Sequence, residues 1–228
     1  MCIGIDALDI FSPPEIISKG IISKENGENV PFIIELGLSK SSILECNKWK
    51  DFVTEIIMPF VINGTDKRDY KELLQSDIML EDSHWNWIYK AFKYNNADNN
   101  WFFLKTSDGI QGVCITYHPK ESFLQNVDIF YIEYLSCAPW NRNSTLHTRK
   151  YKGIGTEILK QVQYFFIAKY HYSYGFSLLS LPQAQGFYEK IGMVNISEYN
   201  EKNGLFFYEM SKENAILFFE GRNAAISS

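Results

Sequence analysis

The sequence predicts a mixed α/β domain with one central sheet. Segments in which apolar and polar residues alternate, as in strands, occur between segments that carry apolar residues at helical spacing. Asp108-Gly109 and Asn203-Gly204 each separate two strand-like runs, which is a strong hairpin signal. The expected order is strand, helices, hairpin, strand, helix, strand, helix, hairpin, and it favours helices packed on a single sheet.

The chain is long enough to form a sizeable hydrophobic core. It has 228 residues, of which 46% are hydrophobic and 16% aromatic, a composition typical of a globular protein. We expect a single domain over residues 1–228, with an N-terminal extension at 1–28, a core at 29–210 and a C-terminal tail at 211–228. The net charge of -5 argues against a nucleic-acid partner, which would require a basic surface.

The cysteine spacing and the hydropathy predict a protein without a metal site, a disulfide framework or a membrane span. The four cysteines are widely spaced and include no C-x-x-C pair, so we expect neither a metal site nor a disulfide framework. The first residues lack the basic start of a signal peptide and carry Asp6 and Asp9. No apolar run approaches the roughly 20 residues of a membrane span. We therefore expect a cytoplasmic protein without a membrane partner.

The first half of the chain predicts one strand followed by helices. Residues 30–38 alternate and are expected to form the first strand. Ser42-Ile43-Leu44-Glu45 matches a capping box, which predicts a helix that starts there and ends or kinks at Pro59. Further helical segments are expected at about 67–75 and 82–94. The apolar stripe of the last segment, read as core or as part of an acceptor pocket, is Trp85, Ile88, Tyr89 and Phe92.

The second half of the chain predicts most of the sheet. Its expected elements, in chain order, are a hairpin of strands 101–106 and 111–117, a strand at 128–137, a helix at 156–170, a strand at 176–181, a helix from Pro182 to about 191, a closing hairpin of strands 194–199 and 205–210, and a short helix at 212–220.

A basic run with a glycine turn lies between the 128–137 strand and the following helix. Gly153-Ile154-Gly155 stands where that helix begins, and no Asp or Glu occurs between Tyr134 and Thr156. A glycine turn at a helix start exposes backbone N–H groups, and the helix dipole favours an anion there. Such a place suits a pyrophosphate. The cations beside it are Arg142, Arg149, Lys150 and Lys152.

Three segments resemble the GNAT superfamily of N-acetyltransferases. Residues 150–155, Lys-Tyr-Lys-Gly-Ile-Gly, resemble its Gln/Arg-x-x-Gly-x-Gly/Ala signature, with Lys150 where Gln or Arg is usual. Residues 132–139 look like its fourth strand, I-E-x-L-x-V-x-P. Residues 184–193 are similar to its A-x-x-F-Y-E-K-x-G-F segment. The resemblance is strong from about Trp101 to Met210.

This resemblance implies both a fold and an activity. The fold would be a central mixed, mostly antiparallel sheet of six to seven strands, flanked by helices and splayed between strands 4 and 5. The activity would be transfer of an acetyl group from acetyl-CoA to a primary amine, directly in a ternary complex. The implied cofactor-binding residues are Leu135, Ser136, Cys137, Arg142, Arg149, Lys150, Tyr151, Lys152, Gly153, Ile154, Gly155 and Thr156.

Two residues are candidates for acid–base catalysis. An alkylamine has a pKa near ~10, so a base must remove its proton at neutral pH. Glu133 lies where many family members carry that base, although an ordinary ion pair or an exposed side chain is the alternative. Tyr188 matches the tyrosine that protonates the departing thiolate in many members, and its alternative is a tyrosine that packs in the core or against the cofactor.

Two other functions stay open on the sequence alone. Many family members bind the pantetheine arm with an asparagine where this chain has Leu181, so a non-catalytic acyl-CoA-binding module is an alternative. A longer acyl donor is a further alternative. The acceptor is a small-molecule or protein amine, and exposed sheet edges near the C-terminal hairpin would allow a homodimer. The loop at 138–149 either covers the cofactor, shapes the acceptor site or forms a disordered insert.

Overall fold

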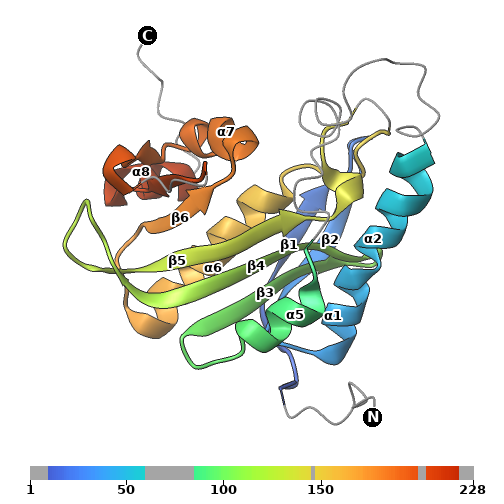
Figure 1. Cartoon of the computed structure of the whole chain (residues 1–228), viewed down its shortest axis with the longest axis horizontal. Helices are drawn as coiled ribbons and strands as arrows, with labels where there is room; N and C mark the ends of the chain where they lie inside the picture. Colours follow the sequence, from blue (N-terminus) through green and yellow to red (C-terminus); the bar gives the residue numbers. More distant parts are fainter. Residues whose placement is uncertain (1–9, 60–84, 145–146, 200–203, 221–228) are drawn as a thin grey trace. The chain divides into compact units, whose positions relative to one another are not determined.

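The computed structural model describes residues 10–59, 85–144, 147–199 and 204–220 (Figure 1). The chain divides into two compact units, one of residues 1–114 and 135–158 and the other of residues 115–134 and 159–228. The expected helical segment at 67–75 lies outside the described residues.

The described strands form one sheet in the order β1-β2-β3-β4-β5-β6-β8-β7. Antiparallel pairs join β1 to β2, β2 to β3, β6 to β8 and β7 to β8, and a parallel pair joins β5 to β6. This confirms the mixed, mostly antiparallel sheet, with eight strands in place of six to seven. The strands are β1 (Glu15–Ser23), β2 (Asn29–Leu36), β3 (Asn99–Thr106), β4 (Gly109–Glu121), β5 (Asp128–Cys137), β6 (Phe176–Ser180), β7 (Val194–Asn195) and β8 (Phe206–Glu209).

Helices and helical turns connect these strands. The α-helices are α1 (Lys40–Asn47), α2 (Trp49–Phe52), α5 (Trp87–Lys93), α6 (Ile154–Tyr170), α7 (Gln185–Lys190) and α8 (Lys212–Phe219). A π-helical turn, η2 (Val53–Ile57), continues α2. The 3-10 turns are η3 (Pro139–Asn141), η4 (Pro182–Ala184) and η5 (Ser197–Tyr199). The expected strand at 194–199 is therefore wrong beyond Asn195, because the chain turns into η5 there.

Strand β1 is an addition to the elements that the sequence analysis expects. It pairs along β2 from Glu15 opposite Leu36 to Ser23 opposite Asn29 (Figure 1). The Phe32 ring lies directly on Gly20, where a Cβ atom would be 2.5 Å from the ring. The strand has no clean alternation because it lies at the edge of the sheet, so periodicity does not reveal it.

Helix α1 begins three residues earlier than the capping box predicts. Ser39 is the N-cap, and its hydroxyl accepts a hydrogen bond from the Ser42 N–H at 3.1 Å. Ser42 is fully buried inside the helix, so the expected cap at Ser42 is wrong. Glu45 does not reach back to a helix N–H but accepts a hydrogen bond from the Ile110 N–H at the start of β4.

The core interpretation of the apolar stripe expected near α5 is wrong for Tyr89 and Phe92, whereas Trp85 and Ile88 are half-buried. Tyr89 is 65% exposed and Phe92 is 48% exposed, whereas Trp87 and Ala91 are buried. Trp87 packs edge-on against Trp49 of α2, with ring centroids 5.7 Å apart. This contact turns the Trp87 side of the short helix inward, and α5 lies beside α1 (Figure 1).

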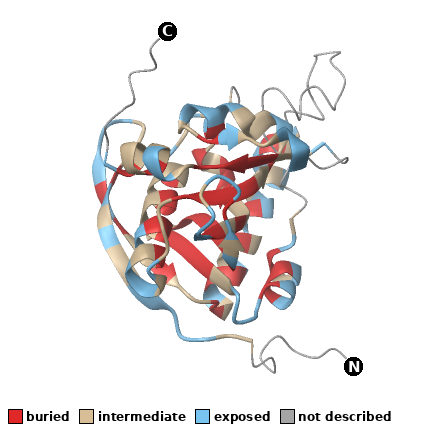
Figure 2. Cartoon of the chain, turned by 90° about the vertical axis from the view of Figure 1, so that its left-hand side faces the viewer, coloured by how far each residue is buried: buried red, intermediate tan, exposed pale blue. Residues whose placement is uncertain are grey.

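The second unit has an aromatic core between β5, β6 and α6. Phe130 of β5 stacks on Phe166 of α6 at 4.5 Å and on Phe176 of β6 at 5.4 Å between ring centroids. The parallel register joins Phe130–Ile132 to Phe176–Leu178, in the first half of β5. These are the strands between which we expect the sheet to splay. Figure 2 shows that buried residues concentrate on the strands.

A buried carboxylate organises the turn between β4 and β5. Glu209, at the end of β8, is fully buried. Its oxygens accept hydrogen bonds from the Phe123 N–H at 3.1 Å, the Leu124 N–H at 2.9 Å and the Ser122 hydroxyl. The buried charge is therefore paired with three donors, and these hydrogen bonds tie β8 to the turn.

We predict that Glu209→Ala lowers the free energy of unfolding by about 3 kcal/mol, because it leaves the buried Ser122 hydroxyl and two backbone N–H groups without their acceptor. Urea unfolding measures the change. Glu121→Ala removes the same charge from an exposed position at the end of β4 and should change stability by no more than about 0.5 kcal/mol. Equal losses in both variants would show that the turn does not depend on the Glu209 carboxylate.

Candidate functional site

The first turn of α6 presents unpaired backbone donors. Gly153 has a φ of +72°, and its carbonyl accepts the first helical hydrogen bond from the Glu157 N–H at 2.9 Å. The N–H groups of Ile154, Gly155 and Thr156 precede that bond, so they have no acceptor inside the helix. A Cβ atom on Gly153 would meet no atom within 4 Å. The turn is therefore open, and it can bind an anion at the positive end of the helix dipole.

A glycine on β4 sets the position of this turn, and the sequence analysis does not single it out. A Cβ atom on Gly112 would lie 2.6 Å from Ile158 Cδ1 and 2.7 Å from Ile154 Cγ2. Only a residue without a side chain lets α6 start this close to the strand. Nothing in local periodicity marks Gly112, because the constraint comes from a helix more than 40 residues further along the chain.

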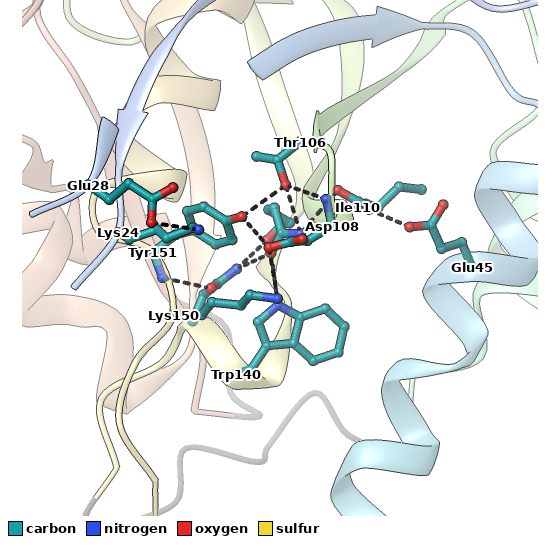
Figure 3. A network of polar contacts seen from close by, with 12 residues as sticks. Lys24, Glu28, Glu45, Thr106, Asp108, Ile110, Trp140, Lys150 and Tyr151 are labelled. Atoms are coloured by element: carbon teal, nitrogen blue, oxygen red, sulfur yellow. Dashed lines mark hydrogen bonds and ion pairs between the residues drawn. The ribbon is translucent and has the colours of Figure 1, made fainter. Parts of the chain in front are cut away.

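Tyr151 holds the chain just before α6. Its side chain is 1% exposed, and its hydroxyl donates to Asp108 Oδ2 while it accepts from Thr106 Oγ1 at 3.3 Å (Figure 3). Its backbone N–H donates to Asn141 Oδ1 at 3.1 Å. Burial and the hydrogen bond to Asp108 raise the pKa of the phenol. The Tyr151 side chain therefore anchors the loop from the inside.

The cations beside the glycine turn are paired with acids from other turns. Lys150 Nζ lies 2.8 Å from Asp108 Oδ2 in the turn between β3 and β4 (Figure 3). Glu25, in the turn between β1 and β2, pairs with Arg149 at 3.0 Å and with Lys152 at 3.1 Å. These cations hold the pKa of each carboxyl below its ordinary value; the Tyr151 hydrogen bond adds to the effect at Asp108. Neither acid is a neighbour of the basic run in the sequence.

One of the backbone donors expected to hold an anion is used within the protein. The Lys152 N–H donates to the Ser23 carbonyl at 3.0 Å. The Lys152 N–H is therefore not open to an anion, because β1 takes it up, and only the side chain of this expected cofactor-binding residue stays available. The open donors begin after it, in the first turn of α6.

Arg142 contacts the end of β5. Its Nε and Nη2 atoms donate to the Cys137 carbonyl at 3.1 and 2.8 Å, and Nη2 also lies 3.2 Å from Ser136 Oγ. The carbonyl of Cys137, one of the implied cofactor-binding residues, therefore has a partner in the protein. Leu135 and Cys137 are half-buried, and the Cys137 thiol is not in a disulfide.

Gln111 connects the loops around the site, and it is not among the site residues predicted from the sequence. Its fully buried side chain accepts hydrogen bonds at Oε1 from Trp140 Nε1 at 2.8 Å and Asn141 Nδ2 at 3.0 Å. Its Nε2 donates to Thr106 Oγ1 at 3.2 Å. The described part of the 138–149 loop is thus anchored at its start. A polar residue inside an apolar strand run is the sequence signal that marks Gln111.

The expected acid–base residues both lie in the second unit. Phe130 faces α6, so strand alternation places Glu133 on the opposite face of β5, where it is half-buried. Tyr188 of α7 is 8% exposed and packs 6.2 Å from the Tyr208 ring, measured between centroids. Tyr208 donates to Glu189 at 2.8 Å, and burial, followed by this hydrogen bond, raises its pKa to about 12. The expected cofactor-binding residues belong to the first unit.

The described part of the chain has neither a metal cluster nor a membrane span. It contains no group of three or more His, Cys, Asp or Glu side chains placed to hold a metal ion. None of its helices is long and apolar enough to cross a bilayer.

Comparison with known proteins adds to this geometry. Residues 142–214 match the family of acetyltransferase (GNAT) domains. No curated protein matches the chain. An uncharacterised protein from Bacillus halodurans has a similar fold, with a TM-score of 0.52 and 10% identity, over 91% of this chain and 95% of that one. The PaiA N-acetyltransferase from Thermoplasma acidophilum, solved in complex with coenzyme A, has a TM-score of 0.44 and 14% identity, over 78% of this chain and 98% of that one.

We predict that Gly112→Ala destabilises the protein by about 1–3 kcal/mol, since the added methyl group forces Ile154 and Ile158 to move. Gly186→Ala is the matched control, because a Cβ atom there meets no atom within 4 Å and Gly186 lies inside α7. The control should stabilise by up to about 1 kcal/mol. Thermal unfolding of both variants measures the difference, and a neutral Gly112→Ala would contradict the close approach of α6 to β4.

Proposed function

We propose that this chain is a member of the GNAT acetyltransferase family and that it transfers an acetyl group from acetyl-CoA to a primary amine directly in a ternary complex. The observation that carries the proposal is the open first turn of α6, which lies within the segment matched by the family. The acceptor is a small-molecule or protein amine. A net charge of -5 favours a cationic acceptor over a nucleic acid.

The residues at the start of α6 fit a pyrophosphate. The N–H groups of Ile154, Gly155 and Thr156 supply converging donors, and Gly153 leaves the approach to them open. Arg149 and Lys152 add side chains that form charge-assisted hydrogen bonds with phosphate oxygens. Acetyl-CoA, when bound, supplies the activated acetyl thioester. The protein's part is to hold its phosphates and to orient its acyl end.

Proton transfer is assigned to the second unit. Glu133 takes a proton from the acceptor amine, directly or through water, because an amine with a pKa near ~10 is otherwise protonated at neutral pH. Its half-buried position on the face of β5 opposite α6 supports this role. Tyr188 gives a proton to the departing thiolate. The phenol of its neighbour Tyr208 is engaged with Glu189 and, with a pKa of about 12, is a poorer proton donor.

A second candidate function is acyl-CoA binding without transfer. It is favoured by Leu181, which replaces the asparagine that binds the pantetheine arm in many family members. Leu181 lies at the start of η4, and its carbonyl accepts a hydrogen bond from Ser180 Oγ at 2.8 Å. Its side chain offers no polar group to an amide of the arm. Turnover with a panel of amines separates this function from the first.

Calorimetric titration with acetyl-CoA tests the cofactor part of the proposal. We expect micromolar binding, weaker binding of 3′-dephospho-CoA and weaker binding still of ATP, which lacks the pantetheine arm. The Gly153→Val variant should lose most of the affinity, because valine resists the positive φ at this turn and covers the open donors. Wild-type protein that takes up no acetyl-CoA would refute both candidate functions.

Two substitutions test the catalytic assignments. Glu133→Gln should lower kcat by roughly 10²–10⁴-fold at neutral pH and less at high pH, where the amine deprotonates by itself. Tyr188→Phe should lower kcat by a factor of at least about 10 with the Kd of acetyl-CoA unchanged. Steady-state rates over a pH series provide the measurement, and Glu198→Gln, at an exposed position of η5, is the control. Full activity of both variants would remove these assignments.

A further inference from the structure

The turn between β1 and β2 is attached to the basic run by main-chain hydrogen bonds. The Glu25 N–H donates to the Lys150 carbonyl at 3.0 Å, and the Lys152 N–H donates to the Ser23 carbonyl at 3.0 Å. Lys24 and Tyr151 form an antiparallel bridge between these two bonds. These main-chain contacts therefore keep the turn beside the basic run independently of the side chains of the turn.

The Glu25 carboxylate lies between two cations of the basic run. Oε2 is 3.0 Å from Arg149 Nε, and Oε1 is 3.1 Å from Lys152 Nζ. Each oxygen takes one cation, as two oxygens of a phosphate group would. The three side chains are 30–47% exposed, so the pairs are open to exchange with a dissolved anion.

The pair between Lys150 and Asp108 is of a different kind. Asp108 also accepts the hydroxyl of the buried Tyr151, so its carboxylate is part of the support of the loop. Among the described residues, the Glu25 carboxylate bonds only to Arg149 and Lys152. Replacing Glu25 therefore changes these two cations and little else, because the main-chain bonds of the turn remain.

We propose that Glu25 sets the affinity of the site for the phosphate groups of acyl-CoA, because its carboxylate pairs with Arg149 and Lys152 in the free protein and phosphate displaces it. This inference rests on the proposed function of the α6 start. The pyrophosphate of acyl-CoA carries two negative charges against one on the carboxylate, and its oxygens form strong charge-assisted bonds with guanidinium and ammonium groups. The carboxylate competes at a high effective concentration, since the turn keeps it beside the cations.

The variant Glu25→Gln tests this assignment against a matched control. Glu28→Gln removes the same charge from the same turn, but Glu28 pairs with Lys24 at 2.9 Å and makes no ion pair with the basic run. We expect Glu25→Gln to bind coenzyme A about three- to tenfold more tightly than wild type at low ionic strength, and Glu28→Gln to stay within about twofold. Isothermal calorimetry with coenzyme A gives both dissociation constants.

Salt dependence and a double-mutant cycle make the test sharper. The gain in Glu25→Gln should shrink as salt rises, because salt screens the exposed cations. In a background of Arg149→Gln and Lys152→Gln, the further change Glu25→Gln should alter the affinity by less than about twofold. A gain that persists in this background would assign the effect to some other group and would overturn the proposal.

The remaining outcomes also decide the matter. Weaker binding by Glu25→Gln would mean that the carboxylate holds the cations in their binding position, and unchanged binding would mean that they do not meet phosphate; either result overturns the inference while the proposed function stands. Wild-type protein that fails to bind coenzyme A would overturn both together. Thermal melting of each variant, expected within about 2 °C of wild type, confirms that the comparison concerns folded protein.

Discussion

The hydrogen bond between the Tyr151 hydroxyl and Asp108 is the contact on which the candidate cofactor site depends. It places a fully buried ring directly before the glycine turn, so the chain enters α6 from a constant position. The Asn141 side chain accepts a hydrogen bond from the Tyr151 backbone N–H and donates one to the Gln111 side chain. The turn between β3 and β4 and the loop after β5 thus meet behind the start of α6. The open N–H groups in front of it need no rearrangement to accept an anion.

The charge around this site is balanced by residues that are distant in the sequence. The chain is acidic overall, with a net charge of -5, and its basic run contains no acid of its own. In the fold, Glu25 and Asp108 neutralise much of that run. In the proposed function, recognition of a phosphate begins at the directed N–H groups of α6, and the surrounding side chains adjust its strength.

The second unit gives the candidate acid–base residues a rigid support. Stacked rings of Phe130, Phe166 and Phe176 hold β5 against α6 and β6, on the side away from Glu133. The buried Glu209 carboxylate ties the turn before β5 to the end of β8. Tyr208, on the same strand, contacts α7 through Glu189. Glu133 thus stands on a strand whose opposite face packs in an aromatic core, and Tyr188 is the buried residue of α7.

The sequence by itself determined the elements whose signals are local. Strand β5 has the predicted bounds, the first hairpin has its Asp108-Gly109 turn, and α6 begins at the glycine motif, because alternation, helical spacing and turn residues are read within a few positions. Only the tertiary structure decided that β1 joins the sheet, that Ser39 caps α1, that Gly112 admits α6 and that Glu25 meets Arg149. The last pair is 124 positions apart in the sequence. Such contacts depend on packing and charge between distant segments, and they produce no periodic pattern in the sequence.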